Sequence, residues 1–293
     1  MHRYVLHNDD VIDAHSKVTS PGQTGLMNGW GVFSTLRVAQ GILFAYERHW
    51  ARMHHDAQRL RVPFPQDPDY IKSRLQKLLE ANNAREATLR VVVVRNHGGP
   101  WEGPGIDHDF DLIAFTTGLT DWGDSVRLAI KPNARHAQNE FAGAKIMSWA
   151  QNLAWYEEAH ERGFDEVLLL NERGEVSECT SANIFAAAGS RVMTPPLSSG
   201  CLPGVTRELL LDEIAVDDIS IHEQPLRPAD LEQADEVFIT STTRDLLPVR
   251  LVDGLRIKHG ERVLELLREK LVEYRKAYIK SSSAAAEPVY NRI

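Results

Sequence analysis

Four short stretches of the chain carry side chains that could do chemistry. Lys145 lies in GAKIM, and Glu178 lies in SECTSANIF, between two apolar runs. A lysine amine can form a reversible imine with a carbonyl compound, and a carboxylate can hold a proton on a nearby base. Taken singly, a lysine at the start of a helix and a glutamate in a loop are most often solvated surface groups. Whether Lys145 and Glu178 belong to a functional site therefore depends on the other motifs in the chain.

The other two stretches are suited to binding an anion. In CLPGVTRE a Pro-Gly turn leads into an expected helix, whose first N–H groups lack intrahelical partners, and Thr206 adds a hydroxyl. Ordinary helix capping would use the same residue types. In ITSTTRDLLPV the hydroxyls of Ser241, Thr242 and Thr243 fall at a strand-to-turn corner that could form an anion-binding nest. A plain hydroxyl-rich turn fits this stretch equally well.

Composition argues against several other classes of function. The net charge of −8 gives no basic surface for nucleic acid or anionic lipid. The two cysteines are too few for a disulfide framework or a Cys-rich metal site, and the twelve histidines are scattered, so no metal site is expected. No apolar run approaches the roughly 20 residues of a membrane span, so no membrane partner is expected and a cytoplasmic location is the default.

The elements that must position these groups indicate an α+β protein of two domains. We expect a smaller α+β domain at 1–118, a connection at 119–125, a larger domain at 126–279 and a mobile tail at 280–293. Periodicity and turn residues predict individual elements. In the first domain these are a hairpin at 31–44 that turns at 39–41, helices near 46–62 and 67–84, and buried strands at 87–96 and 110–118.

The second domain is expected to open with a strand and to end with a helix. Its predicted elements are a strand at 126–134, a helix at 148–162, short strands between 164 and 196, a helix at 205–215, a strand-turn-strand at 235–254 and a closing helix at 260–278. We expect Lys145 at the head of the helix at 148–162, with Trp149, Leu153 and Tyr156 on one face that packs into the core and aims the amine.

The order of the motifs resembles fold-type IV pyridoxal-phosphate enzymes, the class of branched-chain aminotransferases, D-amino acid aminotransferases and aminodeoxychorismate lyases. The resemblance runs from about Met27 to Val252. It is carried by GVFSTLR, ERHWARM, the Lys145 stretch, DEVLLLNERGEVSECTSANIF, TPPLSSGCLPGVTRE and DEVFITSTTRDLLPV. It implies a two-domain fold with pyridoxal 5'-phosphate in the crevice between the domains, and a homodimer.

The resemblance also implies roles for individual residues. Lys145 would form the Schiff base with the cofactor aldehyde, and Glu178 would bond the pyridine nitrogen. The remaining cofactor contacts would come from Arg52, Leu202, Val205, Thr206, Ser241 and Thr242, with Leu202 against the ring and the others at the phosphate. Candidate substrate contacts are Asn28, Phe33, Thr35, Thr88, Arg90, Arg95, His97, Ala150 and Thr243.

The reaction implied is ping-pong transamination between an amino acid and 2-oxoglutarate or another 2-oxo acid. The second half of the chain and Arg90 favour an L-amino acid of branched-chain type. Asn28, Thr88 and Ala150 replace aromatic residues that such enzymes use to line the side-chain pocket, which would leave it roomier or more polar. GVFSTLRV resembles the aminodeoxychorismate lyases, so elimination of pyruvate is an alternative. D-amino acid or (R)-amine transamination, and a non-catalytic cofactor-binding protein, are further alternatives.

Overall fold

The computed structural model describes residues 1–99, 103 and 106–286. Their contacts divide the chain into two compact units. The first unit comprises Met1–Thr120, Lys145–Ser148 and the described residues from Arg275 to Ala286, and the second comprises Asp121–Ala144 and Trp149–Tyr274. The short segment that holds Lys145 therefore groups with the N-terminal unit, although the chain on both sides of it belongs to the other unit.

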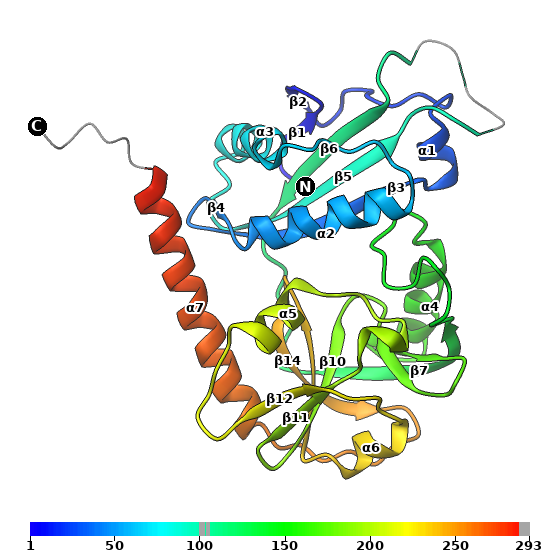
Figure 1. Ribbon diagram of the computed structural model, residues 1–293, viewed down its shortest axis with the longest axis vertical. Helices are drawn as coiled ribbons and strands as arrows, with labels where there is room; N and C mark the ends of the chain where they lie inside the picture. Colours follow the sequence, from blue (N-terminus) through cyan, green and yellow to red (C-terminus); the bar gives the residue numbers. More distant parts are fainter. Residues whose placement is uncertain (100–102, 104–105, 287–293) are drawn as a thin grey trace, which may run out of the picture. The chain divides into compact units, whose positions relative to one another are not determined.

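The first unit is a sheet with two helices on one face (Figure 1). Its elements are β1 (Tyr4–His7), β2 (Asp10–Asp13), α1 (Thr24–Asn28), β3 (Gly31–Ala39), β4 (Ile42–Leu43), α2 (Tyr46–Arg59), α3 (Pro68–Ala81), β5 (Ala87–Arg95) and β6 (Phe110–Thr117). The strands follow the order β2-β1-β6-β5-β3-β4, and every pair is antiparallel. The expected buried strands, β5 and β6, lie in the middle of this sheet.

Local signals explain the elements of this unit. Gln40 and Gly41 both have positive φ, at 53° and 81°, which suits the tight hairpin expected between β3 and β4. Asp67 caps α3 by accepting from the Asp69 N–H at 2.9 Å, and Pro68 occupies the first turn. The hairpin and the start of this helix are therefore confirmed where the sequence placed them.

Alternation along the strands gives this sheet two different faces. Val32, Ser34 and Leu36 of β3 are buried on the side that α2 and α3 cover. The alternate apolar residues of β5 and β6 that share this core are Leu89, Val91, Val93, Leu112 and Ala114. Phe33 and Thr35 point to the opposite side, because successive side chains alternate across a strand. Thr35 pairs with Arg90 in the register of β3 and β5, so Arg90 shares that opposite face.

The second unit is built on a larger mixed sheet. Its elements are β7 (Val126–Arg135), α4 (Ala150–Glu161), β8 (Glu166–Asn171), β9 (Val176–Cys179), β10 (Asn183–Ala188), β11 (Arg191–Thr194), the 3-10 turn η1 (Leu197–Ser199), α5 (Val205–Asp212), β12 (Ser220–Glu223), α6 (Pro228–Gln233), β13 (Glu236–Ser241) and β14 (Asp245–Val252). The strand order is β12-β11-β10-β13-β14-β7-β8-β9, with β7 parallel to both β14 and β8. The two units together confirm the α+β fold class.

The expected packing of α4 is wrong. Its buried residues are Asn152 and Ala159, with Trp155 partly buried, and they pack against β7 and β8, whereas Leu153 is 49% exposed. Residues 152, 155 and 159 form a helical stripe as regular as the aromatic one, so periodicity alone could not choose between the two faces. The aromatic stripe of 149, 153 and 156 is thus not the face that enters the core.

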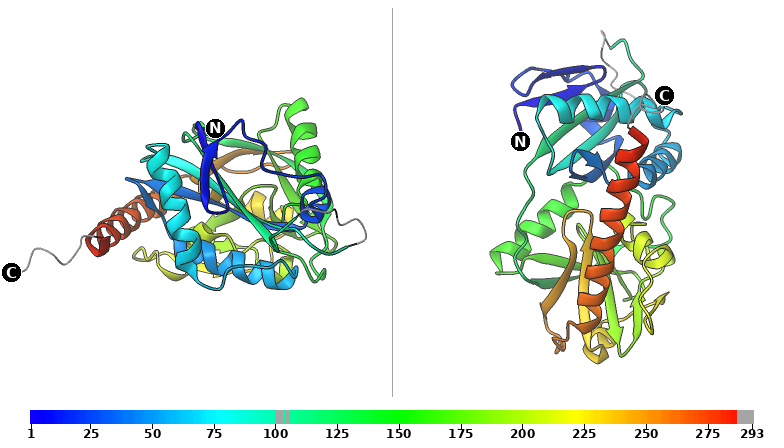
Figure 2. Two further views of the ribbon diagram at one scale, coloured as in Figure 1. Left: turned by 90° about the horizontal axis from the view of Figure 1, so that it is seen from above. Right: turned by 90° about the vertical axis from the view of Figure 1, so that its left-hand side faces the viewer.

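The last helix, α7 (Arg262–Ala286), is longer than expected, and Figure 2 shows it as one uninterrupted helix. Glu236 anchors its start by accepting from the Val263 and Leu264 N–H groups at 2.9 Å. The helix continues past the expected end at 278 and covers the first part of the tail expected at 280–293, as far as Ala286. Alanine has the highest helix propensity, and Ile279 is buried just before this part. The rest of that tail, 287–293, lies outside the described residues. No helix in the described part of the chain is long and apolar enough to cross a membrane.

Candidate active site

Lys145 sits in an extended segment that joins the edge of β3. Phe33 N–H donates to the Lys145 carbonyl at 3.1 Å, and Met147 N–H donates to the Gly31 carbonyl at 2.9 Å. On its other side the Lys145 N–H donates to the Asp56 carboxylate on α2 at 2.9 Å. The expectation that Lys145 heads a helix is wrong, because α4 begins only at Ala150. Its backbone is fixed instead by hydrogen bonds from both sides.

The Lys145 amine lies beside an aromatic ring and a second positive charge. Its Nζ atom is 4.6 Å from the centroid of the Phe33 ring, and the Arg90 guanidinium carbon is 4.0 Å from the same centroid. Burial lowers the pKa of Arg90 from its ordinary value. The Arg90 guanidinium thus places a positive charge on the same ring as the Lys145 amine, which suits an acidic substrate.

Arg52 is held by a buried polar relay within the same unit. Its Nη2 atom donates to the Ser34 hydroxyl at 2.9 Å, and that hydroxyl lies 2.8 Å from His49 Nδ1. Burial, followed by the charges of Arg52 and Lys145, lowers the pKa of His49 well below its ordinary value. The imidazole is therefore neutral at physiological pH and adds no positive charge to this group.

The other substrate candidates of this unit lie in different surroundings. Thr35 and Thr88 lie with Arg90 on the face of the sheet opposite α2 and α3. Asn28 ends α1, where the Ser148 hydroxyl donates to its carbonyl at 3.4 Å. Arg95 and His97 form a separate group, because the Arg95 guanidinium stacks 4.3 Å from the Trp30 ring and donates to the His97 carbonyl at 2.6 Å.

Glu178 lies in the second unit and is 8% exposed. Arg135 Nε donates to its Oε1 atom at 3.0 Å, and the Leu202 N–H donates to its Oε2 atom at 3.0 Å. Arg135 in turn donates to Asn152 on α4 at 3.2 Å. Sequence reasoning missed Arg135, because a lone arginine at the end of β7 carries no motif until the fold brings its side chain to Glu178, which lies two strands away on β9.

The start of α5 is shaped for close approach of an anion. Gly204 precedes the helix, and no side chain among the described residues caps it. A Cβ atom at Gly204 would lie 2.0 Å from Asn183 Oδ1, so only glycine fits there. The first N–H groups, those of Val205 and Thr206, thus remain available to an outside acceptor.

The hydroxyl-rich turn between β13 and β14 is held in place by Arg244. Ser241 Oγ accepts from the Arg244 N–H at 3.2 Å and lies 3.4 Å from Thr243 Oγ1, with Thr242 between them. Arg244 is buried and pairs with Glu166 at 3.3 Å, which fixes the turn to β8. Ala150, the remaining candidate, is exposed in the first turn of α4.

Both cysteines are buried and are expected to be unreactive in the folded protein. Burial, with a further contribution from Glu178, raises the pKa of Cys201 to about 12, and burial raises the pKa of Cys179 well above its ordinary value. At pH 8 about one Cys201 thiol in 10⁴ would be ionised. We expect a chromogenic disulfide reagent to titrate neither thiol in the native protein and both in guanidinium chloride. Rapid native labelling of Cys201 would contradict this burial.

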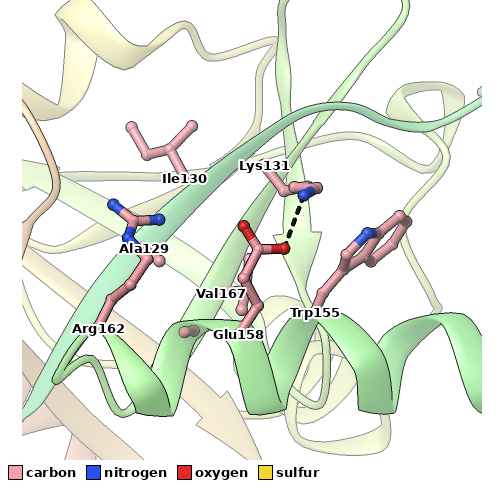
Figure 3. A pocket seen from close by; sticks show the side chains of 8 residues that line it. Ala129, Ile130, Lys131, Trp155, Glu158, Arg162 and Val167 are labelled. Atoms are coloured by element: carbon pink, nitrogen blue, oxygen red, sulfur yellow. Dashed lines mark hydrogen bonds and ion pairs between the residues drawn. The ribbon is translucent and has the colours of Figure 1, made fainter.

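One shallow hollow of the second unit holds none of these residues. It is lined by α4, β7 and β8, and Figure 3 shows Lys131 paired with Glu158 at its rim, 2.9 Å apart, beside Trp155. An exposed ion pair over an apolar floor of alanine, isoleucine and valine suggests no chemistry. Within the described ranges no group of three or more His, Cys, Asp or Glu side chains could hold a metal ion.

Comparison with known proteins shows the family. Residues 31–252 match the family described as amino-transferase class IV. A putative branched-chain-amino-acid aminotransferase of Methanocaldococcus jannaschii is 30% identical over 92% of this chain and 95% of its own length. A D-alanine aminotransferase of Listeria innocua is 25% identical over 88% of this chain and 90% of its own. The chain belongs to the class IV aminotransferases, as its motifs indicated, and the activity of that family is transamination.

Solved structures share the fold. The branched-chain amino acid aminotransferase of Escherichia coli superimposes with a TM-score of 0.86 at 23% identity, covering 99% of this chain and 98% of its own. A hypothetical aminotransferase from Mycobacterium tuberculosis in a PLP-bound form gives a TM-score of 0.82 at 21% identity, covering 94% and 99%. The fold-type IV architecture is thereby confirmed, and the family implies pyridoxal phosphate as its cofactor.

Proposed function

We propose that this protein uses pyridoxal 5'-phosphate to transfer an amino group from a branched-chain type of L-amino acid to 2-oxoglutarate or another 2-oxo acid. The observation that carries the proposal is the clamped backbone of Lys145, whose amine lies beside Phe33 and Arg90. A solvated surface lysine needs no such anchoring. The relative from Methanocaldococcus jannaschii supports the branched-chain type.

The residues present fit this cofactor chemically. The uncapped start of α5, where a Cβ on Gly204 would collide with Asn183, suits a phosphate group, and Val205, Thr206, Ser241 and Thr242 would supply its hydrogen-bond donors. Arg52 would add a charge-assisted donor. Glu178 would face the pyridine nitrogen, and Leu202 would pack against the ring. These assignments rest on the chemistry of the side chains and on their order along the chain.

Each residue then has a defined task. The bound cofactor supplies an electron sink that stabilises a carbanion at the Cα atom of the amino acid. The Lys145 Nζ atom takes the Cα proton of the substrate, and the positive charge of Arg90 attracts its acidic group. The Glu178 carboxylate keeps a proton on the ring nitrogen. In the proposed site, the helix start and Arg52 would hold the phosphate through both half-reactions.

A donor screen tests the proposed specificity. The purified protein, loaded with cofactor and 2-oxoglutarate, is given single amino donors, and glutamate formation is measured. We expect L-leucine, L-isoleucine and L-valine to react at least about tenfold faster than D-alanine, because a misplaced Cα–H bond loses alignment with the base. Faster turnover of D-alanine would contradict the proposed stereopreference, and faster turnover of other L-amino acids would contradict the branched-chain type.

We further propose a homodimer in the cytoplasm. Light scattering should give about twice the chain mass of 33.0 kDa. Two buried thiols without a disulfide suit a reducing compartment. A monomeric mass in the active preparation would contradict the dimer.

A further inference from the structure

Helix α2 presents three polar side chains on its buried face. His49, Arg52 and Asp56 are spaced three and four residues apart, so they lie in one row along the helix. Their exposures are 1%, 8% and 1%. Arg52 is a cofactor residue in the proposed function and His49 belongs to its relay, but the proposed chemistry leaves Asp56 without a task.

Asp56 reaches the backbone of Lys145. Its Oδ2 atom accepts from the Lys145 N–H at 2.9 Å, on the side opposite the bond from Phe33 N–H to the Lys145 carbonyl. The next residue, Ile146, bridges to Val32 of β3. The peptide groups on both sides of the Lys145 Cα atom are thus tied, one to α2 and the other to β3.

A buried carboxylate in this place needs an explanation. Burial raises the pKa of Asp56, while the Lys145 N–H and the charges of Arg52, Arg59 and His55 oppose that rise. Arg59 forms an ion pair with Asp56, but its Nη1 atom is 3.9 Å from Asp56 Oδ1, which is too long for a hydrogen bond. An unsatisfied buried carboxylate is costly, so the bond to the Lys145 N–H is the contact that justifies it.

We infer that Asp56 is a positioning residue for Lys145, a role that rests on the proposed function of that lysine. The lysine side chain has four rotatable bonds, so only a fixed Cα atom limits the region that Nζ can reach. Asp56 holds the peptide group on the N-terminal side of the Lys145 Cα atom, whereas β3 holds the peptide group on its C-terminal side. It contacts neither substrate nor cofactor in this role and acts through the main chain alone.

Three variants separate this role from simple stabilisation. Asp56→Ala removes the acceptor, and Asp56→Asn keeps an oxygen that can accept the same bond. Arg59→Gln removes the long ion pair and leaves the Asp56 carboxylate with its bond from the Lys145 N–H. Transamination kinetics are measured on each cofactor-loaded protein. We expect Asp56→Ala to lower kcat by about 10- to 100-fold with KM within about threefold. Asp56→Asn and Arg59→Gln should stay within about threefold of the parent kcat.

Hydrogen exchange provides a readout that needs no cofactor. Amide exchange of the 141–149 peptide is followed in the cofactor-free protein, with the β5 peptide at 87–95 as the internal control of folding. Asp56→Ala should speed exchange of the Lys145 amide by at least about tenfold and leave β5 protected, because one bonded amide is released without global opening. Asp56→Asn should retain protection even if Asp56→Ala proves unstable.

The outcomes separate this inference from the proposed function. Unchanged exchange at Lys145 in a folded Asp56→Ala protein overturns the positioning role, whatever the kinetics. If the parent enzyme has no transaminase activity, the proposed function is wrong. The difference in Lys145 amide exchange between the parent and Asp56→Ala still decides whether Asp56 holds the Lys145 backbone. Equal loss of kcat in Asp56→Asn and Asp56→Ala would show that charge matters rather than the hydrogen bond, and would overturn the inference as stated.

Discussion

Replacing Lys145 by alanine is expected to lower the transamination rate by at least about 10⁴-fold, because one side chain acts as both nucleophile and proton carrier. Two hydrogen bonds that hold this position, to Asp56 and from Phe33 N–H, are made by backbone atoms of residue 145. Alanine can make the same bonds, so the variant should fold normally. The rate is measured as formation of glutamate from 2-oxoglutarate with L-leucine as donor, alongside the thermal unfolding midpoint.

A second lysine gives the matched control. Lys131 lies on β7 and pairs with Glu158 at 2.9 Å on the surface, so Lys131→Ala should leave the rate unchanged within about twofold. Borohydride reduction of the loaded parent protein should attach the cofactor mass to the peptide containing Lys145. Attachment at another lysine, or a folded Lys145→Ala enzyme with more than a few per cent of the parent rate, would refute the assignment.

Replacing Glu178 by glutamine is expected to lower kcat by about 10²- to 10³-fold with a smaller change in KM. The amide is nearly isosteric but cannot keep a proton on the ring nitrogen as a carboxylate does, so the effect should fall on the chemical step. It also removes the anionic partner of Arg135, which lies 3.0 Å away. Steady-state kinetics with L-leucine and 2-oxoglutarate measure the effect, with Glu158→Gln as the exposed control.

Arg135 should be coupled to Glu178. Arg135→Gln alone should lower kcat, and the double variant with Glu178→Gln should lose less than the product of the two single effects, because the pair acts as a unit. A multiplicative loss would mean that Arg135 does not act through Glu178. An unchanged kcat in Glu178→Gln would remove this carboxylate from the proposed chemistry.

Local features were predicted well from sequence because their causes are local. The Gln40-Gly41 turn and the Asp67-Pro68 helix start each depend on residue types within a few positions. Continuous apolar runs gave β5 and β6 for the same reason. The family could also be recognised, because the order of its motifs survives in the chain even where single residues differ.

The surroundings of Lys145 could not be predicted, because their causes are distant in sequence. Its segment is extended only because the edge of β3 is free to accept it, and Asp56 reaches it from α2. The partnership of Arg135 with Glu178 depends in the same way on β7 and β9 flanking β8. A hydrophobic pattern reports which face of an element is apolar, but it does not report which polar backbone groups meet across a fold.

The most direct test of the central claim is a single half-reaction. The purified, cofactor-loaded protein is mixed with excess L-leucine and no oxo acid, and the products are quantified at completion. Transamination through Lys145 predicts about one equivalent of the matching 2-oxo acid per active site and no further turnover until 2-oxoglutarate is added. Failure to release that oxo acid from L-leucine or any other amino acid, or multiple turnovers yielding pyruvate from aminodeoxychorismate without an acceptor, would contradict the account.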